Sequence, residues 1–154
     1  MDLQDLHKYK ALQLLDLSEN EISDAAGLAK CPNLLSAKLE NNKVESLASY
    51  TDAIKADKME NLQLLSFKGN QLTELQSLEL PMLMYLNLDG NNLTSLAGTL
   101  DACKKLTKLE VRENKLTTTA GIEGLEVSAI TRCTHELSPA VLLCVTHRSQ
   151  GTQP

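Results

Sequence analysis

Length, composition and charge exclude several classes of protein. The chain has 154 residues, of which 42% are apolar and only 3% aromatic, and its net charge is -5 at neutral pH. No apolar run approaches the roughly 18 residues of a membrane-spanning helix, and the scattered lysines offer no basic face for nucleic acid or an anionic membrane. A leucine-rich core with few aromatic rings indicates one packing solution that repeats along the chain.

An internal repeat, L-x-x-L-x-L-x-x-N-x-L with modest substitutions, occurs five times between residues 12 and 116. Its asparagines follow one another at intervals of 22, 28, 21 and 23 residues, within the roughly 20–29 residues of leucine-rich repeats. The pattern predicts an α/β fold, a leucine-rich repeat solenoid with a curved parallel sheet on its concave face and short helical or 3₁₀ segments on its convex face. We assign residues 1–124 to this domain of about five repeats, and residues 125–154 to a degenerate last repeat and an irregular tail.

The N-terminal residues bear on both the compartment and the end of the solenoid. Residues 1–7 lack the basic and apolar regions of a secretory signal, so we expect an intracellular, cytoplasmic protein. Leu3, Leu6 and Tyr9 match the convex half of a coil whose strand is missing. An open end exposes apolar strand edges to water, and we expect another protein or further sequence to cover it.

Two kinds of position in the repeat, the L-x-L leucines and the asparagine, define its strands and turns. The leucines of each L-x-L point to the same side of a short strand and pack against neighbouring coils. The asparagine closes the turn after the strand, where its amide serves backbone groups of adjacent coils. We expect a buried ladder of Asn20, Asn42, Asn70, Asn91 and Asn114.

The segments between strands predict the convex side. Residues 49–58 lengthen one coil and indicate a longer helix or bulge, in which Tyr50 and Ile54 would share one side. A tolerated insertion is favoured there over a docking element. The apolar residues of 72–83 recur about every third position, which favours a short 3₁₀ or helical segment. Cys31 and Cys103 fall at apolar convex positions and are expected to pack as small buried side chains.

The concave face is the expected partner surface, because residues between the inward leucines project from it. Leu64 and Tyr85 fall in one row of adjacent coils and form an apolar spot among mixed charges. Such a spot favours a protein partner, with a solvated face bearing incidental apolar residues as the alternative. The expected protein-binding residues are Leu64, Tyr85, Lys38, Lys68, Asp89 and Arg112.

The sequence contains no catalytic motif. His7 stands alone, and no nucleophile-elbow, Walker or zinc-protease string occurs, so we expect neither enzyme activity nor a cofactor.

The C-terminal tail departs from the repeat. Val127 and Ile130 match a sixth strand, after which no C-terminal cap is recognisable. Four residues, Cys133, His135, Cys144 and His147, offer two thiolates and two imidazoles for a tetrahedral zinc site. The single residue between Cys133 and His135 is tighter than usual zinc spacing. A frayed or alternative C-terminus is favoured, so no metal is predicted.

Several motifs carry a resemblance to a known family: residues 17–20, 63–72, 86–91, 111–116 and 119–122. With these motifs and its short coils, the chain resembles intracellular leucine-rich repeat proteins, a group with phosphatase-regulatory and axonemal dynein-associated members. These motifs are particularly similar to the repeats of a leucine-rich repeat protein that is a component of the ciliary radial spoke. The resemblance implies a non-catalytic scaffold in the axoneme of a cilium or flagellum, held in a large cytoskeletal assembly that covers both open ends. The alternative is a regulatory subunit that binds a protein phosphatase through the concave face.

Overall fold

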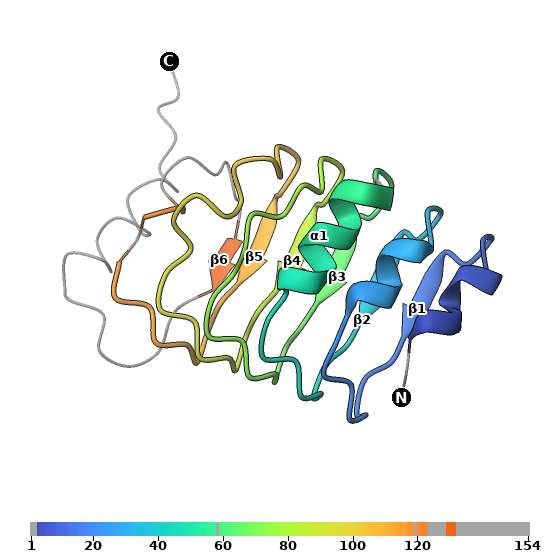
Figure 1. Cartoon of the computed structure of the whole chain (residues 1–154). Helices are drawn as coiled ribbons and strands as arrows, with labels where there is room; N and C mark the ends of the chain where they lie inside the picture. The colour runs from blue at the N-terminus through green and yellow to red at the C-terminus, as the bar shows by residue number, and fades with distance from the viewer. Residues whose placement is uncertain (1–2, 58, 119, 123–128, 132–154) are drawn as a thin grey trace, which may run out of the picture.

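Each repeat contributes one short strand to a parallel sheet (Figure 1). The computed structural model describes residues 3–57, 59–118, 120–122 and 129–131. The strands follow one another in chain order as β1 (Leu14–Asp16), β2 (Ser36–Lys38), β3 (Leu64–Ser66), β4 (Tyr85–Asn87), β5 (Lys108–Glu110) and β6 (Ala129–Thr131). The sheet does not close on itself, and the fold is the expected leucine-rich repeat solenoid.

The strand pairing aligns the middle residue of each strand with the middle residue of the next strand. Leu15 pairs with Ala37, and the row continues through Leu65, Leu86 and Leu109 to Ile130 of β6. From Ala37 to Leu109 these side chains are fully buried. β6 confirms the predicted sixth strand at Ile130, whereas Val127 and the tail from residue 132 onward lie outside the described residues.

Helical segments cover the convex side in the first coils (Figure 1). These are the 3₁₀ helices η1 (Gln4–Lys8) and η2 (Ala26–Lys30) and the α-helix α1 (Ala48–Asp57). None of the described helices is long and apolar enough to cross a membrane.

The return segment at residues 72–80 is irregular, so the expected 3₁₀ or helical turn is wrong there. This coil spans only 21 residues between successive ladder asparagines, against 28 for the coil that holds α1. A helical residue advances about 1.5 Å and an extended one about 3.3 Å, so this coil, with seven residues fewer than the coil of α1, completes its circuit with more extended chain. Leu75, Leu78 and Leu80 are nevertheless buried, and the Leu78 N–H donates to the Thr99 carbonyl at 2.9 Å.

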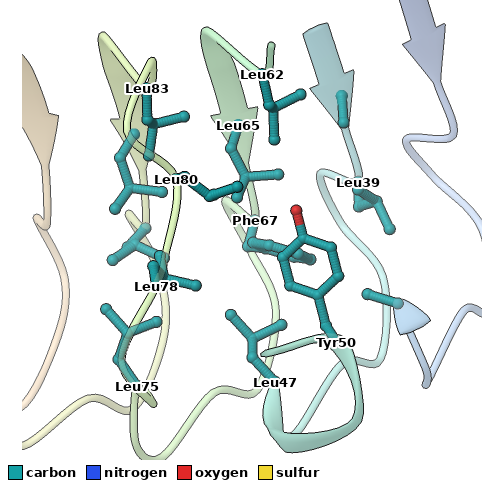
Figure 2. Packing of buried hydrophobic residues seen from close by; sticks show 14 of the residues in the cluster. Leu39, Leu47, Tyr50, Leu62, Leu65, Phe67, Leu75, Leu78, Leu80 and Leu83 are labelled. Atoms are coloured by element: carbon teal, nitrogen blue, oxygen red, sulfur yellow. The ribbon is translucent and has the colours of Figure 1, made fainter. Parts of the chain in front are cut away.

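The inserted helix α1 supplies core packing. Tyr50 and Ile54 lie on the same side of α1, as expected, but that side faces the core and both residues are buried. Figure 2 shows Tyr50 among the leucines of the cluster, beside Phe67; the two ring centroids lie 6.2 Å apart in an edge-to-face arrangement. The Tyr50 hydroxyl donates to Met59 Sδ at 3.6 Å. The alternative in which these two residues dock a partner is therefore wrong.

Two cysteines also pack in the core as small side chains. Cys31 and Cys103 are buried, and their thiols donate to the carbonyls of Leu6 and Leu78 at 3.6 and 3.4 Å. Burial raises the pKa of both thiols, that of Cys103 to about 11. Neither is a reactive thiolate at neutral pH.

Side-chain amides connect each coil to the one before it. Asn70 Oδ1 accepts the Val44 N–H at 3.0 Å, while Asn70 Nδ2 donates to the Leu39 carbonyl at 2.8 Å and to its own coil at Phe67. The same arrangement recurs at Asn42, Asn91 and Asn114. Asn42, Asn70 and Asn91 are buried and Asn114 is partly buried.

Asn20 differs from the other four asparagines, and the expectation that it is buried is wrong. Its side chain is exposed, and Nδ2 donates only within its own coil, to the Leu17 and Ser18 carbonyls at 3.0 Å. Among the described residues no preceding strand lies beside β1 to bury it. Burial of a ladder amide thus requires a neighbouring coil on its N-terminal side.

The residue before each ladder asparagine has a left-handed backbone. The φ angle is 59° at Glu19, 55° at Asn41, 67° at Gly69, 66° at Gly90 and 53° at Glu113. Glycine adopts this conformation at little steric cost, whereas a side-chain-bearing residue pays about 1–2 kcal/mol. At Gly69 a Cβ would also overlap Asn41 Oδ1. The same tight turn therefore occurs in five coils, with glycine in two of them.

We predict that Asn70→Ala lowers the free energy of unfolding by roughly 1–3 kcal/mol, because it leaves buried backbone groups without partners. Asn20→Ala is the matched control and should have a much smaller effect, since Asn20 is exposed. Urea denaturation followed by circular dichroism measures both. Equal losses in the two variants would contradict a role for burial in the ladder.

Candidate functional site: the concave face

Rows of side chains cross the concave face of the sheet, opposite the helices. One row contains Leu14, Ser36, Leu64, Tyr85 and Lys108, and the next contains Asp16, Lys38, Ser66, Asn87 and Glu110. A third row follows two residues past each strand, with Ser18, Glu40, Lys68, Asp89 and Arg112. The register is the one that the repeat spacing predicts.

The structure places Leu64 and Tyr85 directly opposite each other on β3 and β4. Both are partly buried, although they lie on the face turned away from the core. Leu64 also pairs with Ser36 of β2. The pair is therefore an apolar spot near the middle of the sheet.

Tyr85 belongs to a hydrogen-bonded group of four residues, here called the Tyr85 cluster: Tyr85, Asn87, Lys108 and Glu110. The Tyr85 hydroxyl donates to Glu110 Oε2 at 2.7 Å and accepts from Asn87 Nδ2 at 3.1 Å. Asn87 Nδ2 also donates to Glu110 Oε2 at 2.8 Å. Lys108 Nζ lies 2.9 Å from Glu110 Oε1 and 4.5 Å from the centroid of the Tyr85 ring. The ring is thus fixed at its hydroxyl and covered by a cation.

The electrostatics of the Tyr85 cluster keep the tyrosine neutral and the glutamate charged. Burial, followed by the hydrogen bond to Glu110, raises the pKa of Tyr85 to about 12. Burial alone would raise the pKa of Glu110, but the hydrogen bonds from Tyr85 and Lys108 outweigh it and lower that pKa. At neutral pH the cluster is one tyrosine, one carboxylate and one ammonium group held together.

Sequence reasoning did not select Asn87, Lys108 or Glu110 as site residues. Each lies one strand away from Tyr85 or two residues along its own strand. The strand register could have identified them as neighbours of Tyr85, because side chains on one face at these positions are within reach of each other.

The four predicted charged residues lie on the same face as the apolar spot, two or four residues farther along the strands than the row of Leu64 and Tyr85. Lys38, Lys68 and Arg112 are exposed, and none of them forms an ion pair with a carboxylate among the described residues. Asp89 is partly buried; its Oδ1 accepts the Arg112 N–H at 2.6 Å, and burial raises its pKa. Asp89 therefore orders a turn of the face, while the three cations extend into solvent.

The described residues contain no group of three or more histidine, cysteine, aspartate or glutamate side chains placed to hold a metal ion. The candidate zinc residues Cys133, His135, Cys144 and His147 lie outside the residues that the structure describes. The concave face offers hydrogen-bonding groups, an apolar spot and exposed cations, all of which can contact a bound protein.

Comparison with protein families agrees with the repeat. The leucine-rich repeat family model matches residues 11–29. The chain has the leucine-rich repeat fold and is similar to leucine-rich repeat proteins. Solved structures agree with that assignment: internalin C2 from Listeria monocytogenes superposes with a TM-score of 0.72 at 22% identity, over 84% of this chain and 55% of that one. The leucine-rich repeat domain of APL1B gives 0.66 at 22% identity, over 88% and 39%. At such identities the likeness concerns the fold.

Two curated protein sequences are more similar to this chain than these solved structures are. Over 116 residues the chain is 35% identical to leucine-rich repeat-containing protein 23 of Bos taurus. The matched region covers 72% of this chain and 32% of the relative. The protein of the same name from Homo sapiens is 33% identical over 97 residues, 63% of this chain and 26% of the relative. The leucine-rich repeat chain thus spans about a third or less of the curated relatives that it matches.

We predict that Glu110→Gln lowers stability at neutral pH and that this difference shrinks as the pH is lowered into the acid range. Because the folded-state pKa of Glu110 is lowered, its carboxylate stabilises the fold above the unfolded-state value and loses that contribution as the pH falls through the folded-state value. Urea midpoints of the variant and the parent chain, measured over a series of decreasing pH values, give the difference. A difference that stays the same down to the acid limit of the folded state would contradict this assignment of the charge.

Proposed function

We propose that this chain is a non-catalytic scaffold for protein–protein interaction and a structural component of a ciliary axonemal assembly such as the radial spoke. Leucine-rich repeat folds typically act as binding scaffolds, which supports the first part. The second part is supported by the similarity to leucine-rich repeat-containing protein 23. It is also supported by the resemblance of the repeat motifs to those of a radial-spoke component.

The Tyr85 cluster is the observation that carries the binding proposal. Aromatic side chains dominate many interface energies, and a side chain already held in place loses less conformational entropy on binding. Tyr85 is held by Glu110, Asn87 and Lys108 and lies next to the apolar Leu64. A partner that covers this spot gains apolar contact without having to order the tyrosine.

The exposed cations give the same face a role in association. Lys38, Lys68 and Arg112 are exposed on the same face as the Leu64–Tyr85 pair, toward the C-terminal ends of the strands. Exposed charges at the rim of an interface mainly raise the association rate and select the partner, with a smaller effect on affinity. In this proposal the partners are other proteins of the assembly, which also cover the ends of the solenoid.

We predict that Tyr85→Ala weakens binding of the native partner by about 1–3 kcal/mol, as expected for a central aromatic residue. The fold should remain intact, because the side chain lies on the face opposite the leucine core. Quantitative pull-down from ciliated-cell extract, with the thermal midpoint of each variant, measures both effects. Leu64→Ser should act in the same direction.

Lys55→Ala is the matched control, since Lys55 is exposed on the convex helix α1. Loss of partner binding by Lys55→Ala with retention by Tyr85→Ala would place the docking surface on the convex side and overturn the concave proposal.

Proximity labelling in ciliated and non-ciliated cells tests the ciliary part. Co-purified phosphatase activity that Tyr85→Ala abolishes would favour the phosphatase-regulatory alternative.

A further inference from the structure

The carboxylates of the concave face between β2 and β5 form hydrogen bonds within the chain. Glu40 Oε1 accepts the Ser66 hydroxyl at 2.8 Å, and Asp89 Oδ1 accepts the Arg112 N–H at 2.6 Å. Glu110 accepts the hydrogen bonds of the Tyr85 cluster. All three carboxylate side chains are partly buried. Their negative charge is therefore held close to the sheet and is already used by donors of this chain.

Three cations of the same coils remain available to a partner. Lys38, Lys68 and Arg112 are exposed, and none lies within ion-pair distance of a carboxylate in the described part of the chain. Glu40 lies beside Lys68 in the third row, two residues after Lys38, yet its carboxylate bonds to Ser66. From β2 to β5 the charge that this face turns to solvent is therefore mainly positive, although the net charge of the chain is -5.

The polar side chains at the centre of the face are also used within the chain. Ser66 and Asn87 pair in the second row and are only 1% and 5% exposed. The Ser66 hydroxyl donates to Glu40, and Asn87 Nδ2 donates within the Tyr85 cluster. Asn87 Oδ1 accepts the Asp89 N–H at 2.9 Å. What the centre offers to a partner is therefore the apolar surface of the Leu64–Tyr85 pair.

The apolar pair and the cations are separated along the strands. Leu64 lies in the first row, Lys68 lies in the third row of the same coil, and Lys38 lies in the second row of the coil before. At about 3.3 Å per residue, the second and third rows lie about 7 Å and about 13 Å from the first. Both lie toward the C-terminal ends of the strands. A matching partner therefore carries its anionic groups on one side of its apolar group.

We propose that the concave face binds an acidic polypeptide segment, which places one apolar side chain on Leu64 and Tyr85 and its carboxylates toward Lys38 and Lys68. The proposal rests on the concave binding role given above and names the chemistry of the partner at that surface. Complementary charge across an interface selects the partner and speeds association. A basic segment would instead meet three unpaired cations.

A polypeptide fits this surface better than a nucleic acid does. Binding of a nucleic acid strand uses a row of cations that follows its backbone. Here the partly buried carboxylates of Asp89 and Glu110 interrupt the cations, and the centre is an apolar pair. An apolar side chain can cover that pair while neighbouring carboxylates reach the lysines.

Selection from a random peptide library displayed on phage, against the immobilised full chain, tests the chemistry of the partner. Enriched peptides should carry aspartate or glutamate on one side of an apolar residue. The dissociation constant of a synthetic copy should rise with salt concentration. Replacing one acidic residue of the peptide by its amide should weaken binding about threefold. Replacing the apolar residue by serine should weaken binding as well.

Charge reversal in the chain tests the two lysines. Lys38→Glu and Lys68→Glu should each raise the dissociation constant of the acidic peptide about fivefold or more, because attraction becomes repulsion. Lys55→Glu makes the same change on the convex helix α1 and should leave the constant unchanged. All three lysines are exposed, so circular dichroism of the variants should match the parent. A peptide with lysine in place of its acidic residues should bind the Lys38→Glu/Lys68→Glu double variant more tightly than the parent.

Several results would overturn the acidic partner. These are a selection that enriches no peptide, enriched peptides without an acidic bias, and an acidic peptide that Lys55→Glu weakens as much as Lys68→Glu does. An oligothymidine that binds more tightly than the peptide and competes with it would replace the polypeptide by a nucleic acid. Tyr85→Ala separates this proposal from the concave binding role. Acidic peptides that Tyr85→Ala binds with full affinity would contradict that role, whereas peptides without charge bias that this variant fails to bind would leave it intact and reject the acidic partner.

Discussion

The asparagine ladder is the interaction on which the solenoid depends. Each ladder amide from Asn42 onward accepts an N–H from the preceding coil and donates to a carbonyl of that coil, so it fixes the separation and register of neighbouring turns. The strands themselves are only three residues long and hold little by their own pairing. Because every coil is held mainly by its neighbours, stability in such a fold is a sum of local terms and contacts between adjacent coils.

The regular ladder also permits irregularity on the convex side. Coils with α1, with a 3₁₀ helix and with extended chain all present their strand in the same register. The inserted helix uses its extra length to bury Tyr50 against Phe67, which fills space that leucines alone leave between coils. The concave face is unaffected by these differences, so the rows of side chains around Tyr85 stay aligned.

Much of this arrangement follows from the sequence, because periodicity fixes register. The spacing of L-x-L and asparagine predicts which residues share a strand row, and so it places Leu64 beside Tyr85. It does not predict the side of α1 that carries Tyr50, since this depends on how the inserted helix is rotated against the sheet. Nor does it predict the hydrogen bonds of Glu110, which depend on side-chain rotamers across two strands. The exposure of Asn20 depends on a neighbour that a pattern within one coil cannot reveal.

The left-handed residue before each asparagine has a consequence for how the molecule opens. Gly69 and Gly90 take this conformation in the coils of β3 and β4, while Glu19 and Glu113 take it in outer coils. Since a glutamate is strained there by about 1–2 kcal/mol, the turns of the outer coils are less stable than those with glycine. Unfolding should therefore begin at the ends and reach the middle last, with amide hydrogen exchange slowing from β1 toward β3 and β4. Leu64 and Tyr85 lie on the part of the sheet that such fraying leaves intact.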